Sequence, residues 1–180
     1  MEPLRLVSKP VSKEEQPVLL GRIISDRIFC AYLVKGILQR AWNLVGHLRV
    51  KEMKPNIFLF TFDSEESKQR IFMEGPWSIQ NKHIILKQWD PSRQLDEIDF
   101  TTTSFWVHVL GLPPSQMNKE SAEIIGKQFF LKISNIQPED EEDLRWVEFI
   151  RFKADLNALE PLVVGFDVEK EDGETGWVTL

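Results

Sequence analysis

Residues 56–62, with the sequence NIFLFTF, constrain the fold more than any other stretch, because phenylalanine occupies every second position. Side chains of a β-strand point alternately to its two faces, so this spacing predicts a strand with the phenylalanines on one face and Ile57 and Leu59 on the other. Phenylalanine is among the residues most often buried in proteins. We therefore expect the three rings to lie in a hydrophobic core, and Ile57 and Leu59 to point away from it.

Strand and helix signals around this stretch follow a regular order. They predict strand, helix, strand, strand, helix and strand over residues 18–25, 26–43, 47–53, 56–62, 63–75 and 82–89. This order predicts an α+β fold with a ferredoxin-like, RNA-recognition-motif-like βαββαβ domain over residues 17–91, in which two helices cover one face of a four-stranded sheet and leave the other open. Residues 1–16 are polar and contain prolines, and we expect a flexible tail there.

The rest of the chain predicts a second, smaller unit. Residues 92–103 are charged and are expected to form a linker, and residues 104–180 an acidic α+β unit that ends in a β-hairpin. Its elements are expected as a strand, a helix capped by Asn118, and four further strands, over residues 104–113, 118–130, 130–136, 145–156, 162–170 and 176–180.

The first predicted helix contains the single cysteine of the chain, Cys30. We expect Ser25 or Asp26 to cap this helix and its buried stripe to include Phe29, Leu33, Ile37 and Ala41, with Cys30 as a small buried apolar residue. One cysteine supports neither a disulfide nor a cysteine-based zinc site within these 180 residues.

Charge is divided unevenly along the chain. The formal net charge is −6; residues 1–100 hold 15 Lys and Arg against 13 Asp and Glu, whereas residues 101–180 hold 7 against 15. This balance argues against a uniformly basic nucleic-acid binder. If the phenylalanine face is core, however, strand alternation gathers a basic set on the opposite, open face, with Ile57 and Leu59 at its centre: Arg22, His47, Arg49, Lys51 and Lys87, and Trp89 at one end.

This basic face predicts contact with the phosphate backbone of single-stranded RNA or DNA, with Trp89 able to stack on a base. Two other interpretations stay open: the charges are ordinary solvated residues, or the second unit covers the face. Most of the six tryptophans are expected to pack in the interior, and Trp89 or Trp146 are the candidates for a stacking surface.

Signals for other classes of protein are weak. The sequence has no glycine-rich phosphate loop and no recognisable catalytic histidine pairing, so we expect no enzyme, no cofactor and no metal site; the acidic run 138–143 is expected to be a solvated loop. No apolar run reaches about 18 residues and no signal peptide is recognisable, so we expect no membrane partner and a location inside the cell, in nucleus or cytoplasm.

Several motifs resemble those of a plant domain-of-unknown-function family. The most specific are the end of the first helix at Trp42, the phenylalanine strand, the tripeptides Gly75-Pro76-Trp77 and Trp89-Asp90-Pro91, and the strand from Trp106 to Pro113. The resemblance covers residues 17–180. Members of that family lie N-terminal to a CCHC zinc knuckle and are related to the leading segment of non-LTR (LINE-type) retrotransposon polyproteins. The resemblance implies an RNA-recognition-like first unit and nucleic-acid binding; with one cysteine, these 180 residues lack the knuckle itself.

Two functional hypotheses follow. The first is a retrotransposon-related module that binds single-stranded RNA or DNA with low sequence selectivity through Arg22, Arg49, Lys51 and Lys87. The second is a protein-interaction or self-assembly module without direct nucleic-acid contact, in which the open sheet or an edge strand meets another chain.

Overall fold

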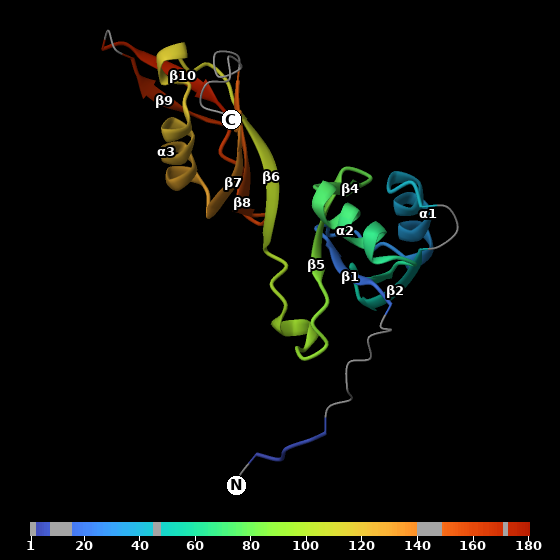
Figure 1. The fold of residues 1–180 in the computed structure, drawn as a ribbon. Helices are drawn as coiled ribbons and strands as arrows, with labels where there is room; N and C mark the ends of the chain where they lie inside the picture. Colours follow the sequence, from blue (N-terminus) through green and yellow to red (C-terminus); the bar gives the residue numbers. More distant parts are fainter. Residues whose placement is uncertain (1–2, 8–15, 45–47, 140–148, 171–172) are drawn as a thin grey trace.

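The computed structural model describes residues 3–7, 16–44, 48–139, 149–170 and 173–180. Over these residues the chain is an α+β protein with three α-helices and mainly antiparallel sheets, as expected from the sequence. Figure 1 shows a five-stranded sheet with α1 and α2 on one side of the molecule, and the later strands with α3 on the other. None of the helices in these residues is long and apolar enough to cross a membrane.

The first part of the chain forms the five-stranded sheet. Its strands lie in the order β2-β3-β1-β5-β4, and every neighbouring pair is antiparallel. The elements run in the order β1 (Val18–Ile23), α1 (Ala31–Ala41), β2 (Arg49–Lys54), β3 (Ile57–Thr61), α2 (Glu65–Glu74), β4 (Trp77–Ile79) and β5 (Lys82–Gln88). The α+β class is confirmed, and the short edge strand β4 was not expected from the sequence.

The core of this part lies between the sheet and the two helices. The three phenylalanines of the β3 region are fully buried and pack with Val34 and Leu38 of α1 and Ile71 of α2. Trp42 joins them, with its ring centroid 5.2 Å from that of Phe60 in an edge-to-face arrangement. Full burial of each such side chain stabilises the fold by about 1.5–3 kcal/mol. The prediction that the phenylalanine face is core is therefore confirmed.

Close packing leaves no room for a side chain at Gly21 of β1. A Cβ atom there would lie 2.5 Å from the Phe60 ring and 3.1 Å from Ile84 and Leu86. Glycine at this position lets the large rings of β3 approach the neighbouring strand.

Helix α1 begins later than the sequence predicts. Its N-cap is Cys30, not Ser25 or Asp26, and Cys30 is exposed, so the expectation of a buried cysteine is wrong. The residues of α1 that are fully buried are Val34 and Leu38, one position along from the predicted stripe, and Ala41 is exposed. The later start has a tertiary cause, because the side chain of Asn56, distant in the sequence, forms hydrogen bonds with the backbone of Ser25, Arg27 and Phe29.

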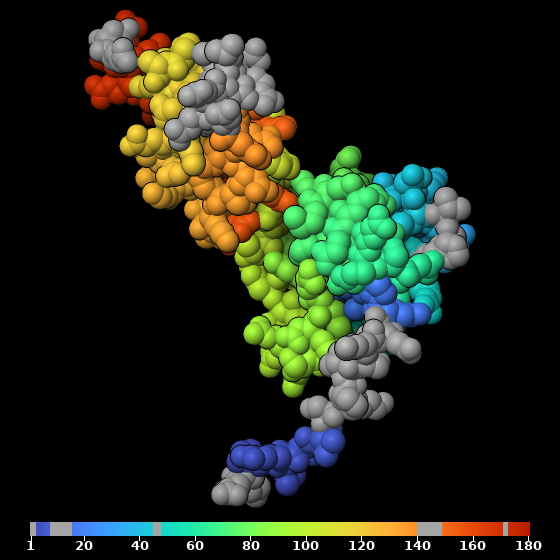
Figure 2. Space-filling view, viewed as in Figure 1, coloured from blue at the N-terminus to red at the C-terminus, as the bar shows by residue number. Residues whose placement is uncertain are grey.

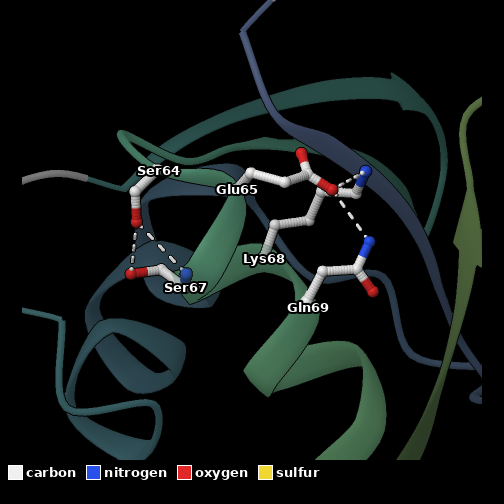
Figure 3. Close-up of polar contacts among 5 residues, drawn as sticks. All are labelled: Ser64, Glu65, Ser67, Lys68 and Gln69. Carbon is white, nitrogen blue, oxygen red and sulfur yellow. Dashed lines mark hydrogen bonds and ion pairs between the residues drawn. The ribbon is translucent and has the colours of Figure 1, made fainter.

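Helix α2 begins within the predicted range 63–75, and of the two capping residues that the sequence offers, Asp63 and Ser64, its N-cap is Ser64. The Ser64 hydroxyl oxygen accepts a hydrogen bond from the Ser67 backbone N–H at 3.1 Å, and one turn further the Glu65 carboxylate accepts from Lys68 at 3.0 Å and from Gln69 at 2.8 Å (Figure 3). A carboxylate in the first turn also interacts favourably with the helix dipole. The Ser64 contact satisfies one of the free backbone N–H groups at the start of the helix, whereas the Glu65 contacts join side chains on its surface.

The second part of the chain forms a three-stranded and a two-stranded sheet. Its elements are η1 (Leu95–Glu97), β6 (Thr102–Val109), η2 (Pro114–Gln116), α3 (Lys119–Phe129), β7 (Lys132–Gln137), β8 (Ile150–Asn157), β9 (Gly165–Glu169) and β10 (Thr175–Thr179). Strands β6, β8 and β7 form one antiparallel sheet in that order, and β9 and β10 form the predicted hairpin.

Helix α3 covers one face of the three-stranded sheet. Asn118 caps it as expected, because its side-chain oxygen accepts from the Ser121 N–H at 2.8 Å. Ala122 and Ile125 of α3 pack on Phe152 and other buried residues of β8. The opposite face of this sheet carries the other half of each strand's side chains.

Candidate functional site

The predicted basic residues lie on the face of the five-stranded sheet opposite the phenylalanines. Lys51 of β2 pairs with Leu59, Leu59 with Leu20 of β1, and Leu20 with Lys87 of β5. A single row of side chains thus crosses four strands, with a lysine at each end and two leucines between. We call this side of the sheet the outer face.

The basic side chains differ in exposure. Arg49 and Lys51, both on the edge strand β2, are exposed, whereas Arg22 and Lys87 on the inner strands are half-buried. His47 lies outside the described residues. The structure therefore brings four of the predicted residues to one face, and the pair on β2 is the most accessible to a ligand.

The centre of the outer face is not open, contrary to the sequence-based expectation. Leu20 and Ile85 are 0% and 1% exposed, because Leu95, Ile98 and Phe100 from the segment predicted to be a linker pack over them. Apolar side chains on both surfaces favour this contact, since each buried CH₂ group stabilises by about 0.8 kcal/mol. The accessible basic residues consequently lie at the rim of a covered centre.

Acidic groups of this covering segment meet part of the basic set. Asp96 forms an ion pair with Lys54, the last residue of β2. Hydrogen bonds from the Thr101 side chain and N–H lower the pKa of Asp99 to about 2, and the charge of Lys87 acts in the same direction. Lys87 thus has a carboxylate near it within the chain, whereas Arg49 and Lys51 project from the opposite edge of the sheet.

Trp89 does not present an exposed ring. Its side chain is half-buried and packs in the same apolar cluster as Leu20, Ile57 and Phe100. The expectation that Trp89 forms an exposed ring at one end of an open sheet is therefore wrong. The covering segment is the reason.

His83 of β5 joins the two parts of the chain. Its Nε2 lies 2.7 Å from the Thr103 hydroxyl oxygen, and its ring centroid lies 4.9 Å from that of Phe105. Burial of the ring lowers the pKa of His83, which favours the neutral form, although a hydrogen bond with the backbone of Trp77 acts in the opposite direction.

A second contact between the two parts of the chain is the 3.4 Å hydrogen bond from Lys153 of β8 to the carbonyl of Met73 in α2. Figure 2 shows the orange region of β8 against the green region of α2.

Comparison with known families finds a match for the first part of the chain. Residues 13–97 match the family described as Domain of unknown function (DUF4283). This segment is therefore similar to the DUF4283 family. The match supports the resemblance to a domain-of-unknown-function family, over a shorter range than the expected 17–180. No curated protein and no solved structure matches the chain.

The DUF4283 match includes the basic outer face and the first residues that cover it. Its range runs through β1 to β5 and ends at Glu97, the last residue of η1. Leu95 therefore belongs to the matched segment, and Ile98 and Phe100 follow it directly.

The three-stranded sheet, beyond the DUF4283 match, has a polar face that the sequence-based reasoning missed. Along β8 the residues alternate between buried and half-buried, so that Arg151, Lys153 and Asp155 share the face opposite α3. Trp106 of β6 pairs with Lys153 and lies on the same face, 37% exposed. The signal is visible in the sequence, where Ile150, Phe152, Ala154 and Leu156 alternate with Arg151, Lys153 and Asp155.

A groove of about 500 Å³ lies on the other side of the same sheet, beside the part that α3 does not cover. Its walls are formed by residues of β6, of the C-terminal end of α3 and of the segment after β8, among them Phe105, Val107, Phe129, Leu131, Leu162 and Val163. Leu131 and Leu162 are 68% and 60% exposed. Polar residues, among them Thr101, His108, Gln128 and Glu160, line the rest of the groove.

Proposed function

We propose that the chain is a module that binds single-stranded RNA or DNA with low sequence selectivity. The observation that carries this proposal is the pair Arg49 and Lys51, which are both exposed and both project from the outer face at the edge strand β2. Two adjacent cations on one strand match the repeating phosphates of a nucleic-acid backbone. Arg22 and Lys87 extend the same positive face inward.

The fold supports this proposal. We infer a ferredoxin-like arrangement, because the strands β2-β3-β1-β5 alternate with two helices in the order of a split βαβ unit and β4 adds only a short edge strand. We also infer that residues 17–91 and 104–180 form two units, in keeping with the separate apolar clusters on either side of residues 92–103.

The chemistry of the face predicts low sequence selectivity. The central positions of β3 on this side are Ile57 and Leu59, which offer neither a ring for stacking nor a hydrogen bond for reading a base edge. Contacts would therefore go mainly to phosphates, which carry no sequence information. Binding of this kind weakens steeply as salt concentration rises.

The experiment is fluorescence anisotropy of a labelled 20-nucleotide RNA or DNA titrated with the chain. The variant Arg49→Glu/Lys51→Glu is expected to bind at least tenfold more weakly, because two phosphate contacts are replaced by repulsion. Lys35→Glu/Arg40→Glu on α1 is the matched control, with the same change in net charge on the helical side of the sheet. Equal loss in both doubles would show that only net charge matters and would contradict a site on the outer face.

A second candidate, a protein-interaction or self-assembly module, is supported by the apolar groove beside α3. Exposed leucine side chains in a groove of about 500 Å³ are typical of surfaces that meet another protein chain. Sedimentation over a wide range of concentration tests self-assembly, and Leu131→Asp/Leu162→Asp is expected to abolish any dimer that forms through this groove.

The relationship to plant retrotransposon proteins is likewise a proposal that rests on the resemblance of motifs. We infer that relatives of this chain carry a CCHC zinc knuckle after the second unit, and that the protein works inside the cell, in the nucleus or the cytoplasm. Sequencing of the complete transcript and microscopy of a tagged protein test the two inferences separately.

A further inference from the structure

The side of the three-stranded sheet opposite α3 gathers aromatic and basic side chains from all three strands. The Arg151 guanidinium lies 5.2 Å from the centre of the Trp106 ring and 5.8 Å from that of the Phe149 ring. Trp106 and Lys153 are directly opposite each other on β6 and β8. We call this surface the tryptophan face.

The charge of the tryptophan face is opposite to that of the sequence around it. Residues 101–180 hold 7 Lys and Arg against 15 Asp and Glu, yet β7 and β8 place three cations here: Lys132, Arg151 and Lys153. The carboxylate on the same face, Asp155, accepts a hydrogen bond from the Ser104 hydroxyl. Net positive charge is therefore concentrated on one side of an acidic part of the chain.

Among the described residues, the hydrogen-bond partners found for two of these cations are neutral. Arg151 Nε donates to the side-chain oxygen of Gln137 at 2.6 Å, and Lys153 Nζ donates to the Met73 carbonyl at 3.4 Å. Neutral acceptors hold a cation in position without cancelling its charge, so a phosphate arriving at this face still meets a full positive charge.

Several side chains of the tryptophan face are exposed. Trp106 is 37% exposed, and on the same face His108 of β6 and Lys132 and Ser134 of β7 are exposed. The ring is partly supported from one side by Arg151, whose distance from it is typical of a cation–π contact. A planar base that stacks on the indole would cover its remaining surface.

We propose that the tryptophan face binds single-stranded nucleic acid, with one base stacked on Trp106 and phosphates held by Arg151, Lys153 and Lys132. The inference rests on the proposed function and adds a second contact surface, outside the DUF4283 match, to the one on the five-stranded sheet. A single strand is the expected ligand because only an unpaired base exposes its ring for stacking. Together the two surfaces give the chain a basic rim for the backbone and a ring for one base.

The test is an anisotropy titration of the full chain with labelled 20-nucleotide oligo(U) and oligo(dT) at about 50 and about 200 mM salt. Trp106→Ala is expected to weaken binding about tenfold at both salt concentrations, since loss of one base stack is worth about 1–3 kcal/mol. The matched control is Trp177→Ala, which removes an even more exposed indole, 56% exposed, on β10. Comparison of the two oligonucleotides distinguishes RNA from DNA as the better ligand.

The charge test uses Arg151→Glu/Lys153→Glu, which is expected to weaken binding at least tenfold and to reduce the slope of log affinity against log salt by about two. Lys119→Glu/Lys127→Glu on α3 has the same change in charge on the opposite side of the sheet and is expected to bind as wild type does. If the first double fails to fold, Lys132→Glu replaces it, because Lys132 is exposed at the end of β7.

The outcomes separate this inference from the proposed function. If wild type binds neither oligonucleotide at low salt, both fail. If wild type binds and Arg49→Glu/Lys51→Glu weakens it while the variants of the tryptophan face do not, only the tryptophan face is excluded. A final outcome concerns competition for the bound labelled oligonucleotide. If poly-glutamate competes as well as unlabelled oligonucleotide of equal charge, and Trp106→Ala has no effect, the face is a surface for acidic protein segments. That result would overturn the base-stacking proposal.

Discussion

The side chain of Asn56 holds the backbone of Phe29 in place, although 27 residues separate them. Asn56 Oδ1 accepts a hydrogen bond from the Phe29 N–H at 2.9 Å, and its Nδ2 donates to the carbonyls of Ser25 at 3.0 Å and Arg27 at 2.8 Å. Asn56 itself adopts a φ of 61° at the turn between β2 and β3 and is 7% exposed. One buried amide therefore fixes the loop that leads from β1 into α1.

Replacement of Asn56 by Asp is expected to destabilise the fold by about 2–4 kcal/mol, because both donors are lost and a carboxylate faces two carbonyl oxygens. Urea unfolding followed by fluorescence measures the change. Asn43→Asp is the control, since Asn43 also has a positive φ, 51°, but is exposed. Similar losses at the two positions would show that backbone conformation, and not the hydrogen bonds, gives Asn56 its importance.

Trp42 and Trp77 are expected to respond differently to loss of the indole N–H. The Nε1 of Trp42 is buried without a hydrogen-bond partner among the described residues, whereas that of Trp77 donates to the Ile71 carbonyl at 2.8 Å. Trp42→Phe loses packing volume but removes an unsatisfied donor, so its cost should be below that of Trp42→Ala by about 2 kcal/mol or more. Trp77→Phe leaves the carbonyl without its donor and should cost about 1–2 kcal/mol.

Urea unfolding of the three tryptophan variants checks this ordering. Equal free energies of unfolding for Trp42→Phe and Trp42→Ala would contradict it, because the ring would then contribute nothing beyond its N–H. The edge-to-face contact with Phe60 predicts the opposite.

Asp99 gives the covering segment an acid-sensitive anchor. Its pKa, about 2, lies below the usual 3.8 because Thr101 and Thr102 donate hydrogen bonds to the carboxylate. A carboxylate with a depressed pKa contributes stability that is complete above its unfolded value and is lost as pH falls through the folded value. Between about pH 4 and pH 2, wild type should therefore lose stability relative to Asp99→Asn, as thermal unfolding measures. Parallel pH profiles would show that the carboxylate is not anchored in this way.

The burial of His83 predicts a second change in the stability of the fold, near neutral pH. Burial lowers its pKa from 6.5, so the neutral ring is favoured in the folded chain. Its stabilising effect is complete above pH 6.5 and decreases as pH falls toward the lower folded pKa. His83→Gln should flatten this part of the stability profile, whereas exposed His108→Gln should not. A wild-type profile that is already flat from about pH 7.5 to 5 would contradict the prediction.

Much of the secondary structure follows from the sequence, because the strands alternate clearly and two helix starts have strong caps. Ser64 and Asn118 both accept the hydrogen bonds that their positions predict. The predicted start of α1 at residue 26 was wrong because of a contact with a residue distant in the sequence. A capping residue and the apolar spacing predict a helix from residue 26, but Asn56 binds the backbone of this stretch in a non-helical conformation.

The candidate site was predicted only in part. Strand alternation correctly assigned Arg49 and Lys51 to one face, since that assignment needs only local geometry. The cover formed by Leu95, Ile98 and Phe100 was not predictable from the same pattern, because these apolar residues are interspersed with charges and read as a linker. Whether such a segment lies on a sheet depends on a long-range contact that no local signal encodes.

The measurement that tests the central claim most directly is the affinity of the unmodified chain for oligo(U) and oligo(dT) as a function of salt. The account predicts binding at about 50 mM salt that weakens at least tenfold by about 200 mM, because phosphate contacts release counterions. Absence of binding to both oligonucleotides at the lower salt concentration, with a chain shown to be folded by urea titration, would contradict it.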